Sequence, residues 1–460
     1  MVSLTVSIPL ALSTLAQQRG RTLAFLPCPL AKDRRPRIKE PRLFYSSATS
    51  PKGYISSIDV DEDAPRDVQT FEEWAYNYGA QRSDGFQLVS DDGMDVYAAT
   101  SQDLPTGTPV VFVPEHMILS STKAMSELRT PEMNGAEKVV LSVNAESEMR
   151  HYYIMLKLLV EIEKGEQSDW YPWLNSLPRY YTNAASMTPF CCLCLPSLMR
   201  KLAVKERGNM SRLSVGSIKS VPFLNDDTKY DVDLVNWVYQ VVYTRSVETD
   251  DGDLKLVPMG DYFNHGSEYQ EIEESYDDEG NYYATTIYDV PAGSPLRKLY
   301  GDPTNPSHLF ARYGFLDEDT PATFCKLIPS HINKDMEELG YAENRMLFYK
   351  TGEISQEVWD ILLYQHLSST NIRDKRAMMD AHRQGDYEAK QMLHEDYYSE
   401  TSRLLLEHIE DFLAQLDKLS LKAEDRTRDF EDHPRLPLIL AHNQFVLQTF
   451  FTVRNQYFGY

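Results

Sequence analysis

Residues 256–265 read LVPMGDYFNH and contain the most informative pattern in the sequence, Asp261-x-x-Asn264-His265. A short β-type run comes before the pattern and an acidic segment follows it. On its own the pattern is weak evidence, because Asn and His side chains often bond local backbone groups in polar turns. Its interpretation therefore depends on the residues that accompany it.

Several further groups of residues occur in a fixed order around this pattern. Arg245 lies upstream of it, and the segments 299–301 (LYG) and 313–315 (YGF) lie downstream. Nearer the N-terminus, a β-type run ends in Val113-Pro114, and residues 165–178 place two tryptophans before a Leu-Pro pair. The groups are specific as an ordered set, although no single one is.

This ordered set resembles the SET-domain methyltransferases, and within them the Rubisco large-subunit lysine methyltransferase subgroup, which includes the actin-histidine methyltransferase. The resemblance covers about residues 71–318. It implies an α+β fold, in which a SET domain of small β-sheets carries a helical insert at about residues 144–250. An all-α C-terminal domain, residues 319–460, is similar to the subgroup's substrate-binding domain.

Local patterns agree with this division of the chain. Short β-type runs separated by Asp/Gly turns predict strands at 86–89, 96–98, 109–114, 255–257, 282–288 and 296–300. Helical periodicity predicts helices at 71–80, 144–164 (with Asn144 as the cap), 387–419 and 436–454. The acidic segment 268–279 is expected to be a solvated loop.

The resemblance also implies the site residues and the methyl donor, S-adenosyl-L-methionine. The residues expected to bind this cofactor are Asp92, Gly93, Met94, Arg245, Asp261, Asn264 and His265. Tyr300 matches the family's catalytic tyrosine, while Arg245, Tyr313 and Phe315 are expected to contact the substrate side chain. A purely structural alternative is that Arg245 and Asp261 simply pair with each other.

These residue types suit methyl transfer from a sulfonium to a nitrogen. The reaction is an in-line displacement, so catalysis rests mainly on positioning and desolvation. A narrow aromatic channel excludes water and lowers the pKa of a lysine amine, which favours the neutral form that must attack. The expected function is therefore methylation of a protein side chain, a lysine (or histidine) of a non-histone protein.

Three departures from the family pattern support an alternative, a SET-like interaction module without catalysis. Asp95 stands where the family has the second glycine of a Gly-x-Gly turn, and its carboxylate adds charge near the cofactor. Asn305 lies one residue nearer Tyr300 than in the plant enzymes. The glutamate expected after Gly293 is absent.

Composition excludes other classes of protein. The chain has 460 residues and a net charge of -23, and this negative charge argues against a protein that mainly binds nucleic acid. Five cysteines exclude a disulfide-dense scaffold. The cluster Cys191, Cys192 and Cys194 has no nearby second pair, so small buried side chains are expected rather than a metal site. The protein is expected to be a monomer.

The N-terminal segment differs from the rest in charge. Residues 1–50 carry eight basic and two acidic residues, and no acid precedes Asp33. This composition predicts a targeting presequence, for a plastid before a mitochondrion, followed by a linker at 51–70. A disordered basic tail or a mispredicted start codon is the alternative, in which case cytoplasm or nucleus is expected. No membrane-spanning helix is expected in the mature protein.

Overall fold

The computed structural model describes residues 58–91, 95–214, 216–266, 269–301, 306–316, 331–342, 345–424, 430 and 432–459. The expected presequence lies outside the described residues, as do Asp92, Gly93, Met94 and Asn305. The expected boundary between residues 318 and 319 also lies outside them. It therefore stays a prediction.

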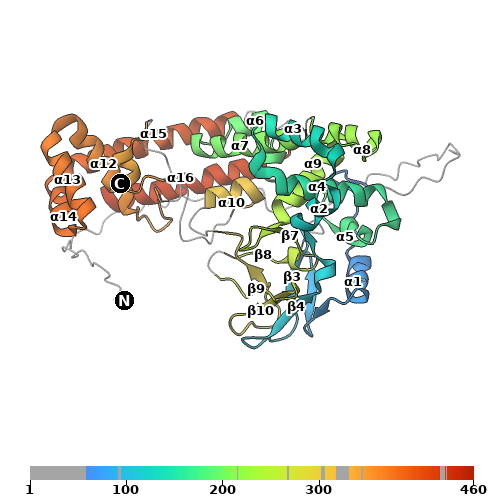
Figure 1. Ribbon diagram of the computed structural model, residues 1–460. Helices are drawn as coiled ribbons and strands as arrows, with labels where there is room; N and C mark the ends of the chain where they lie inside the picture. Colours follow the sequence, from blue (N-terminus) through green and yellow to red (C-terminus); the bar gives the residue numbers. More distant parts are fainter. Residues whose placement is uncertain are drawn as a thin grey trace. The chain divides into compact units, whose positions relative to one another are not determined.

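The strands form several small sheets, as the sequence predicted. The largest is antiparallel with the order β1 (Gln81–Arg82), β4 (Pro109–Val113), β10 (Tyr282–Thr286) and β9 (Ile272–Tyr276), as Figure 1 shows in part. Valines of β4 are buried in the core beneath it, as β-branched side chains favour strands packed on one face.

Three smaller sheets complete the β part of the fold. β2 (Phe86–Val89) pairs with β3 (Tyr97–Thr100), and β5 (Leu119–Ser120), β7 (Leu254–Leu256) and β6 (Val247–Glu248) form a second sheet. In the third, β8 (Asn264–His265) runs parallel to β11 (Arg297–Lys298). This parallel pair brings the Asn-His motif beside the segment that leads into Tyr300.

The prediction of a solvated loop over residues 268–279 was wrong in part. Residues 272–276 form β9, which pairs along its whole length with β10. Ile272 is buried, and Glu274 is tied to Lys298 at 2.7 Å. Charge in a linear run misled the prediction, because alternate acids of a strand point to opposite faces and only some of them face water.

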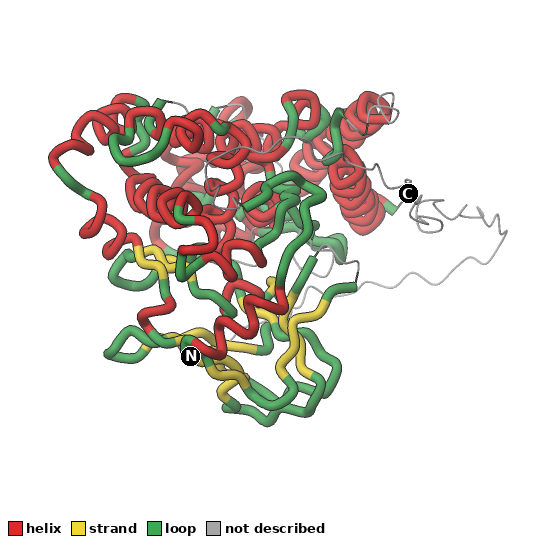
Figure 2. Tube along the Cα trace, turned by 90° about the vertical axis from the view of Figure 1, so that its right-hand side faces the viewer, coloured by secondary structure: helices red, strands yellow, loops and turns green. Residues whose placement is uncertain are grey.

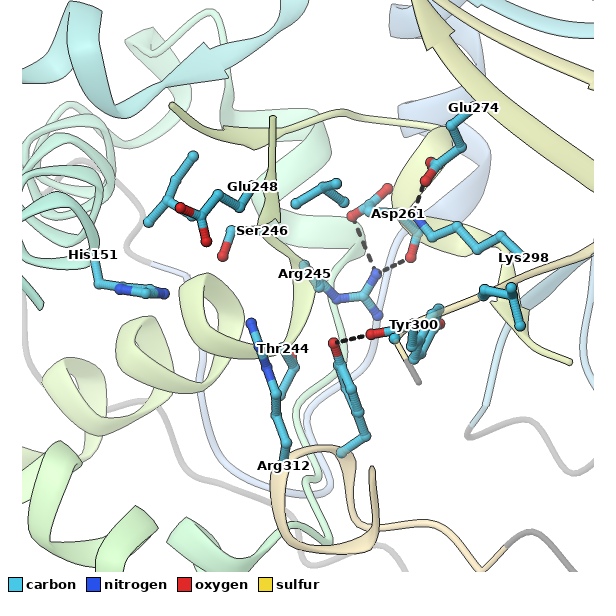
Figure 3. Close-up of a pocket in the computed structure, with 15 residues that line it drawn as sticks. His151, Thr244, Arg245, Ser246, Glu248, Asp261, Glu274, Lys298, Tyr300 and Arg312 are labelled. Atoms are coloured by element: carbon cyan, nitrogen blue, oxygen red, sulfur yellow. Dashed lines mark hydrogen bonds and ion pairs between the residues drawn. The ribbon is translucent and has the colours of Figure 1, made fainter. Parts of the chain in front are cut away.

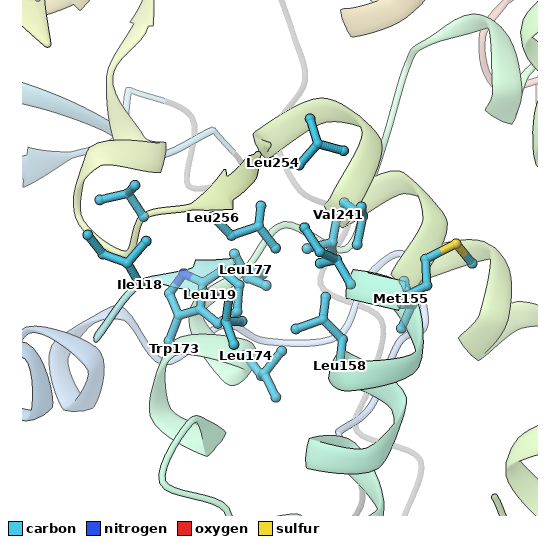
Figure 4. Close-up of a cluster of buried hydrophobic side chains, with 14 of the residues drawn as sticks. Ile118, Leu119, Met155, Leu158, Trp173, Leu174, Leu177, Val241, Leu254 and Leu256 are labelled. Carbon is cyan, nitrogen blue, oxygen red and sulfur yellow. The ribbon is translucent and has the colours of Figure 1, made fainter. Parts of the chain in front are cut away.

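The described helices before β6 are α1 (Val68–Asn77), α2 (Ser121–Leu128), α3 (Asn134–Ser142), α4 (Met149–Glu163), α5 (Tyr171–Ser176), α6 (Pro189–Leu193), α7 (Ser197–Ser214), α8 (Asp226–Tyr230) and α9 (Val232–Arg245). Of these, α4 to α9 lie in the predicted insert and occupy most of it. α4 and α9 pack together in the first hydrophobic core, part of which Figure 4 shows, with Met155, Leu158 and Val241 of the two helices in one cluster with Leu254 and Leu256 of β7.

Asn144 is not the cap of α4, as the sequence analysis expected. Its backbone takes the left-handed conformation, with φ of 55°, and a 3₁₀ turn at residues 146–148 separates it from the first helical residue, Met149. Asparagine adopts this conformation more easily than most residues, so here it reverses the chain rather than capping the helix. Gly165, also at φ of 55°, follows the end of the helix, as predicted.

The C-terminal part is helical, as predicted. Its described helices are α11 (Lys334–Glu338), α12 (Gln356–Thr370), α13 (Ile372–Gln384), α14 (Tyr387–Asp396), α15 (Tyr398–Glu424) and α16 (Leu436–Phe458), and α10 (Pro306–Tyr313) comes before residue 319, where this part was predicted to begin. The single helix expected over 387–419 is broken at Tyr397 into α14 and α15. The last helix continues beyond residue 454 to Phe458, where Gly459 at φ of 68° ends it.

A second hydrophobic core joins these helices to part of the insert. Residues 184–203, including the three buried cysteines, pack with α12, α15 and α16. Figure 2 shows the strands gathered apart from these helices. By length and composition alone α16 could cross a membrane, but its buried residues, among them Ile439, Val446 and Phe450, belong to this core.

Candidate functional site

A cavity of about 340 Å³ lies where the end of α9, the 3₁₀ turn at Gly260–Tyr262, β11 and α10 meet. Four predicted site residues line it, namely Arg245, Asp261, Tyr300 and Tyr313 (Figure 3). The fold thereby brings Arg245 and Tyr300, which are 55 positions apart in the sequence, to one cavity wall.

Arg245 and Asp261 form a buried ion pair at the inner wall. The Arg245 Nη1 donates to the Asp261 backbone oxygen at 2.5 Å and to its Oδ2 at 3.1 Å. The indole Nε1 of Trp173 donates to the same Oδ2 at 3.2 Å. Burial raises the pKa of Asp261, and the Arg245 guanidinium opposes that rise. Arg245 and Asp261 therefore pair with each other, which was the structural alternative for these two residues.

The backbone that carries Asp261 is strained. Met259 adopts φ of 74°, which L-residues other than Asn and Asp rarely take, and residues 260–262 then form one 3₁₀ turn. The turn places the Asp261 carboxylate under Arg245 and directs the following residues into β8. Strain of this kind persists where surrounding contacts hold it, and it clusters at functional sites.

Two buried polar atoms of the pair have no hydrogen-bond partner among the residues that the structure describes. They are Nε of Arg245 and Oδ1 of Asp261. Buried polar groups are nearly always satisfied, so an unsatisfied donor and acceptor at a cavity wall indicate a place where water or a ligand can bond.

The Asn-His motif lies next to this cavity through the β8–β11 pairing. Asn264 is opposite Arg297 and His265 is opposite Lys298. The backbone N–H of Tyr300 donates to Nδ1 of His265 at 3.1 Å. This bond assigns the His265 proton to Nε2 in the neutral ring and ties the motif directly to the predicted catalytic residue.

Tyr300 is fixed by a second bond at its other end. Its hydroxyl donates to the backbone oxygen of Phe263 at 2.7 Å. Burial raises its pKa, and the nearby Arg245 charge opposes that rise. The phenol therefore stays protonated near neutral pH, and because its proton is engaged, its oxygen lone pairs can accept contacts from a ligand.

An aromatic cluster surrounds this phenol. The rings of Tyr300 and Tyr313 are 4.7 Å apart, and the Phe315 ring is 5.5 Å from His265 and 6.4 Å from Tyr300. The Tyr313 hydroxyl donates to the Tyr300 backbone oxygen at 3.5 Å. The two residues predicted to wall the substrate channel thus lie with the predicted catalytic residue.

Gly314 allows this arrangement. Its φ is 79°, and a Cβ there would come within 2.2 Å of the Asn183 backbone nitrogen. Only glycine fits so close to another backbone, so Gly314 lets the chain between Tyr313 and Phe315 press against the insert.

Asp95, the departure from the family pattern, contacts the motif itself. Its Oδ2 accepts from the Asn264 side-chain nitrogen at 3.2 Å. The carboxylate therefore faces the residue that the resemblance assigns to the cofactor, rather than pointing away from it.

Sequence reasoning missed several charged residues of the cavity. The Lys298 ammonium is 2.7 Å from Glu274 and 6.0 Å from the Tyr300 ring centre, and Figure 3 shows this pair on one side of the tyrosine. His151, Glu248 and Arg312 line the other part of the cavity. The adjacency of Lys298 to the Tyr300 segment was the available signal. In the described part of the chain, no group of three or more His, Cys, Asp or Glu is placed to hold a metal ion.

Comparisons with known proteins test the fold. No family model matches the sequence. Human SET domain-containing protein 4 is 24% identical over an alignment of 186 residues that covers 36% of this chain, and the chain spans about two fifths (41%) of that relative's length.

Solved structures are similar over most of the chain. The SET domain of Rubisco LSMT bound to lysine and AdoHcy matches with a TM-score of 0.58 and 14% identity, covering 85% of this chain and 90% of that one. Rubisco LSMT bound to AdoMet matches with a TM-score of 0.55 and 15% identity, covering 86% and 92%. The resemblance predicted from the sequence is confirmed at the level of the fold: this chain has the SET-domain fold in the arrangement of Rubisco LSMT.

Proposed function

We propose that the protein is an S-adenosylmethionine-dependent protein methyltransferase that acts on a lysine side chain. The observation that carries the proposal is the Tyr300 phenol, held at a cavity wall by its 2.7 Å bond to Phe263 beside the Asn264-His265 motif. The fold similarity to Rubisco LSMT, whose structures contain lysine and the cofactor or its product, supports it.

The residues next to the Tyr300 phenol fit the cofactor. Asn264, His265 and Asp95 offer amide, ring and carboxylate groups next to the Tyr300 phenol. The cofactor carries ammonium, carboxylate and sulfonium groups, so these acceptor groups complement its cationic groups. When bound, it supplies an electrophilic methyl group.

The chain's own residues supply positioning and desolvation. Tyr300 presents oxygen lone pairs at a fixed point, which can accept contacts from polarised C–H groups or from the target amine. Such a preorganised dipole acts on the transition state without reorganising during the reaction. The rings of Tyr300, Tyr313 and Phe315 form an apolar wall. Next to that wall a lysine amine loses its proton more readily than in water, which prepares it as the nucleophile.

The substrate class follows from charge as well as from the site. The net charge of -23 favours approach by a protein that is basic around its target lysine. Histidine is the alternative target within the resembled subgroup. Mass spectrometry distinguishes the two targets by the residue that carries the methyl group.

The test has a binding arm and a transfer arm. Calorimetry with S-adenosylhomocysteine should show binding to the full chain that Asn264→Ala weakens strongly. Labelled cofactor incubated with lysate proteins should transfer methyl groups that mass spectrometry assigns to lysine. Binding without transfer would favour a catalytically inactive module, and methyl groups found on histidine would overturn the lysine assignment.

A further inference from the structure

One wall of the cavity is a continuous stretch of chain, residues 244–248. Arg245 ends α9, and Ser246 takes the extended backbone conformation that leads into β6. Exposure increases along this stretch, from Ser246, which is buried, to Glu248, which is exposed. Glu248 therefore lies at a mouth of the cavity, while Arg245 and its partner Asp261 lie further in.

Ser246 and Glu248 share one face of this wall. Alternate residues of an extended chain point to the same side, and both residues line the cavity (Figure 3). Ser246 is only 7% exposed, and its Oγ has no hydrogen-bond partner among the described residues. Buried hydroxyls are nearly always bonded, so a group from outside the chain is expected to complete this one.

Glu248 is the unpaired acid of the cavity. The other two acids that line it are paired, Asp261 with Arg245 at 3.1 Å and Glu274 with Lys298 at 2.7 Å. Glu248 makes no ion pair with any residue that the structure describes. A carboxylate at the rim of a cavity with low-dielectric walls attracts a cation more strongly than one on an open surface.

The basic side chains around this end of the cavity contact other groups. They are His151, which is 3.1 Å from Glu148, Arg312, which donates to the Tyr243 backbone oxygen at 3.1 Å, and Arg150, which lies against Gly252 at the turn after β6. In the described part of the chain, Glu248 thus lacks a counterion, and Ser246 beside it lacks a hydrogen-bond partner.

We propose that Glu248 and Ser246 bind a basic side chain that flanks the target lysine of the substrate. The inference rests on the proposed function and adds the sequence context of the target to it. A guanidinium or an ammonium carries several N–H donors, so it can bond the carboxylate and the hydroxyl at once. One substrate residue would then supply both the counterion of Glu248 and the partner of Ser246.

The length of the wall sets where the basic residue must lie in the substrate. Glu248 follows Arg245 by three residues, which span about 10 Å in an extended chain. An extended substrate covers the same distance in about three residues. An arginine or lysine within three positions of the target lysine is therefore the expected context.

The first arm of the test surveys the methylated sites. The full chain and labelled S-adenosylmethionine are incubated with lysate proteins, and mass spectrometry locates each methylated lysine. Arginine or lysine within three positions should be clearly more frequent at these sites than at unmodified lysines of the same proteins. Equal frequencies would overturn the inference, while the transfer itself would still support the proposed function.

The second arm exchanges charge between enzyme and substrate, with the most strongly methylated protein of the survey. Glu248→Gln should lower kcat/KM by about fivefold, mainly through KM, which is the scale for one unit charge a few ångströms away in a hydrated cleft. Replacing the flanking basic residue of the substrate by glutamine should have a similar effect, and the two changes together should cost no more than either alone. Glu248→Lys should recover transfer to a substrate variant that carries glutamate at the flanking position.

Glu273→Gln is the matched control, because Glu273 is an exposed acid of β9 and is not among the residues that line the cavity. It should leave kcat/KM unchanged for every substrate variant. Additive losses from Glu248→Gln and the substrate change would place the basic residue elsewhere and overturn the inference. A wild type that transfers no methyl group would overturn the proposed function and the inference with it.

Discussion

The hydroxyl of Tyr300 donates to the backbone oxygen of Phe263 at 2.7 Å. This bond holds the phenol against the chain segment that leads into the Asn-His motif. The backbone N–H of Tyr300 donates to His265 from the other side. These two bonds couple the segment of β8 to the segment after β11 at the point where chemistry is proposed. The phenol oxygen is thus oriented by the backbone and not by another mobile side chain.

Tyr300→Phe should slow methyl transfer by roughly 100-fold or more while changing product-analogue affinity little. The ring and its contacts with Tyr313 and His265 remain, and one preorganised polar group is lost. Single-turnover transfer from labelled cofactor measures the rate, and calorimetry measures the affinity.

Tyr364→Phe provides the control for that substitution. Tyr364 lies in α12, and its hydroxyl donates to Asp335 at 2.9 Å, away from the cavity residues. It should lose a similar hydrogen bond without slowing transfer. If Tyr300→Phe transfers as fast as wild type, Tyr300 is a packing residue and the proposed mechanism is wrong.

Gly314→Ala should lower the free energy of unfolding by about 3 kcal/mol or more, because it combines left-handed backbone strain with overlap against a neighbouring backbone. The added carbon would lie 2.2 Å from the nitrogen of Asn183. Urea unfolding followed by circular dichroism measures the change.

Gly107→Ala separates the two contributions. Gly107 has nearly the same φ, 78°, but nothing lies within 4 Å of an added Cβ. The free energy of unfolding should therefore fall by only about 1–2 kcal/mol, because only the backbone strain contributes. Equal losses at the two positions would show that the close approach at Gly314 relaxes easily.

Arg245→Met and Asp261→Asn should each destabilise the fold by about 3–5 kcal/mol, because each leaves its partner buried without its counterion. The double variant should lose clearly less than the sum of the two. A thermodynamic cycle from urea unfolding gives the coupling energy. Additive losses would mean that the pair is not coupled and that each residue acts through its other contacts.

The sequence was sufficient to predict which motifs meet, because the family order of residues reflects a fold in which β8 and β11 lie side by side. Arg245, Asp261, Tyr300 and Tyr313 were all predicted and all line one cavity. Apart from the pairing of Arg245 with Asp261, which the sequence allowed, the bonds of these residues could not be predicted, since the direction of a hydroxyl depends on backbone atoms far away in sequence.

Two predictions from the sequence were wrong for a common physical reason. Glu274 was assigned to a solvated loop because it lies in an acidic run, yet strand alternation turns it toward Lys298. The break at Tyr397 was missed because helix-forming residues continue on both sides of it. In both cases tertiary contacts, absent from a local pattern, determined the outcome.

A buried histidine predicts how stability depends on pH. His442 lies in α16, fully buried, with its ring 4.6 Å from that of Phe310 and its Nδ1 3.1 Å from Oδ1 of Asn443. Burial lowers its pKa from 6.5 to about 4, and the Asn443 contact opposes the shift. The unfolded chain therefore binds a proton at this residue between pH 6.5 and about 4, where the folded chain does not.

This difference in proton binding sets the direction in which stability changes with pH. Because the unfolded state binds more protons in that window, the free energy of unfolding must rise with pH and fall on acidification. Between pH 7.5 and pH 5 the loss assigned to this one residue is about 2 kcal/mol. His442→Gln should remove that part of the pH dependence, whatever its effect on stability at pH 7.5 through packing. Phe310→Leu, a neighbouring core substitution, should lower stability at every pH and keep the wild-type slope. Urea midpoints measured from pH 7.5 to pH 5 give both slopes, and a wild-type slope in His442→Gln would place the titration on other groups.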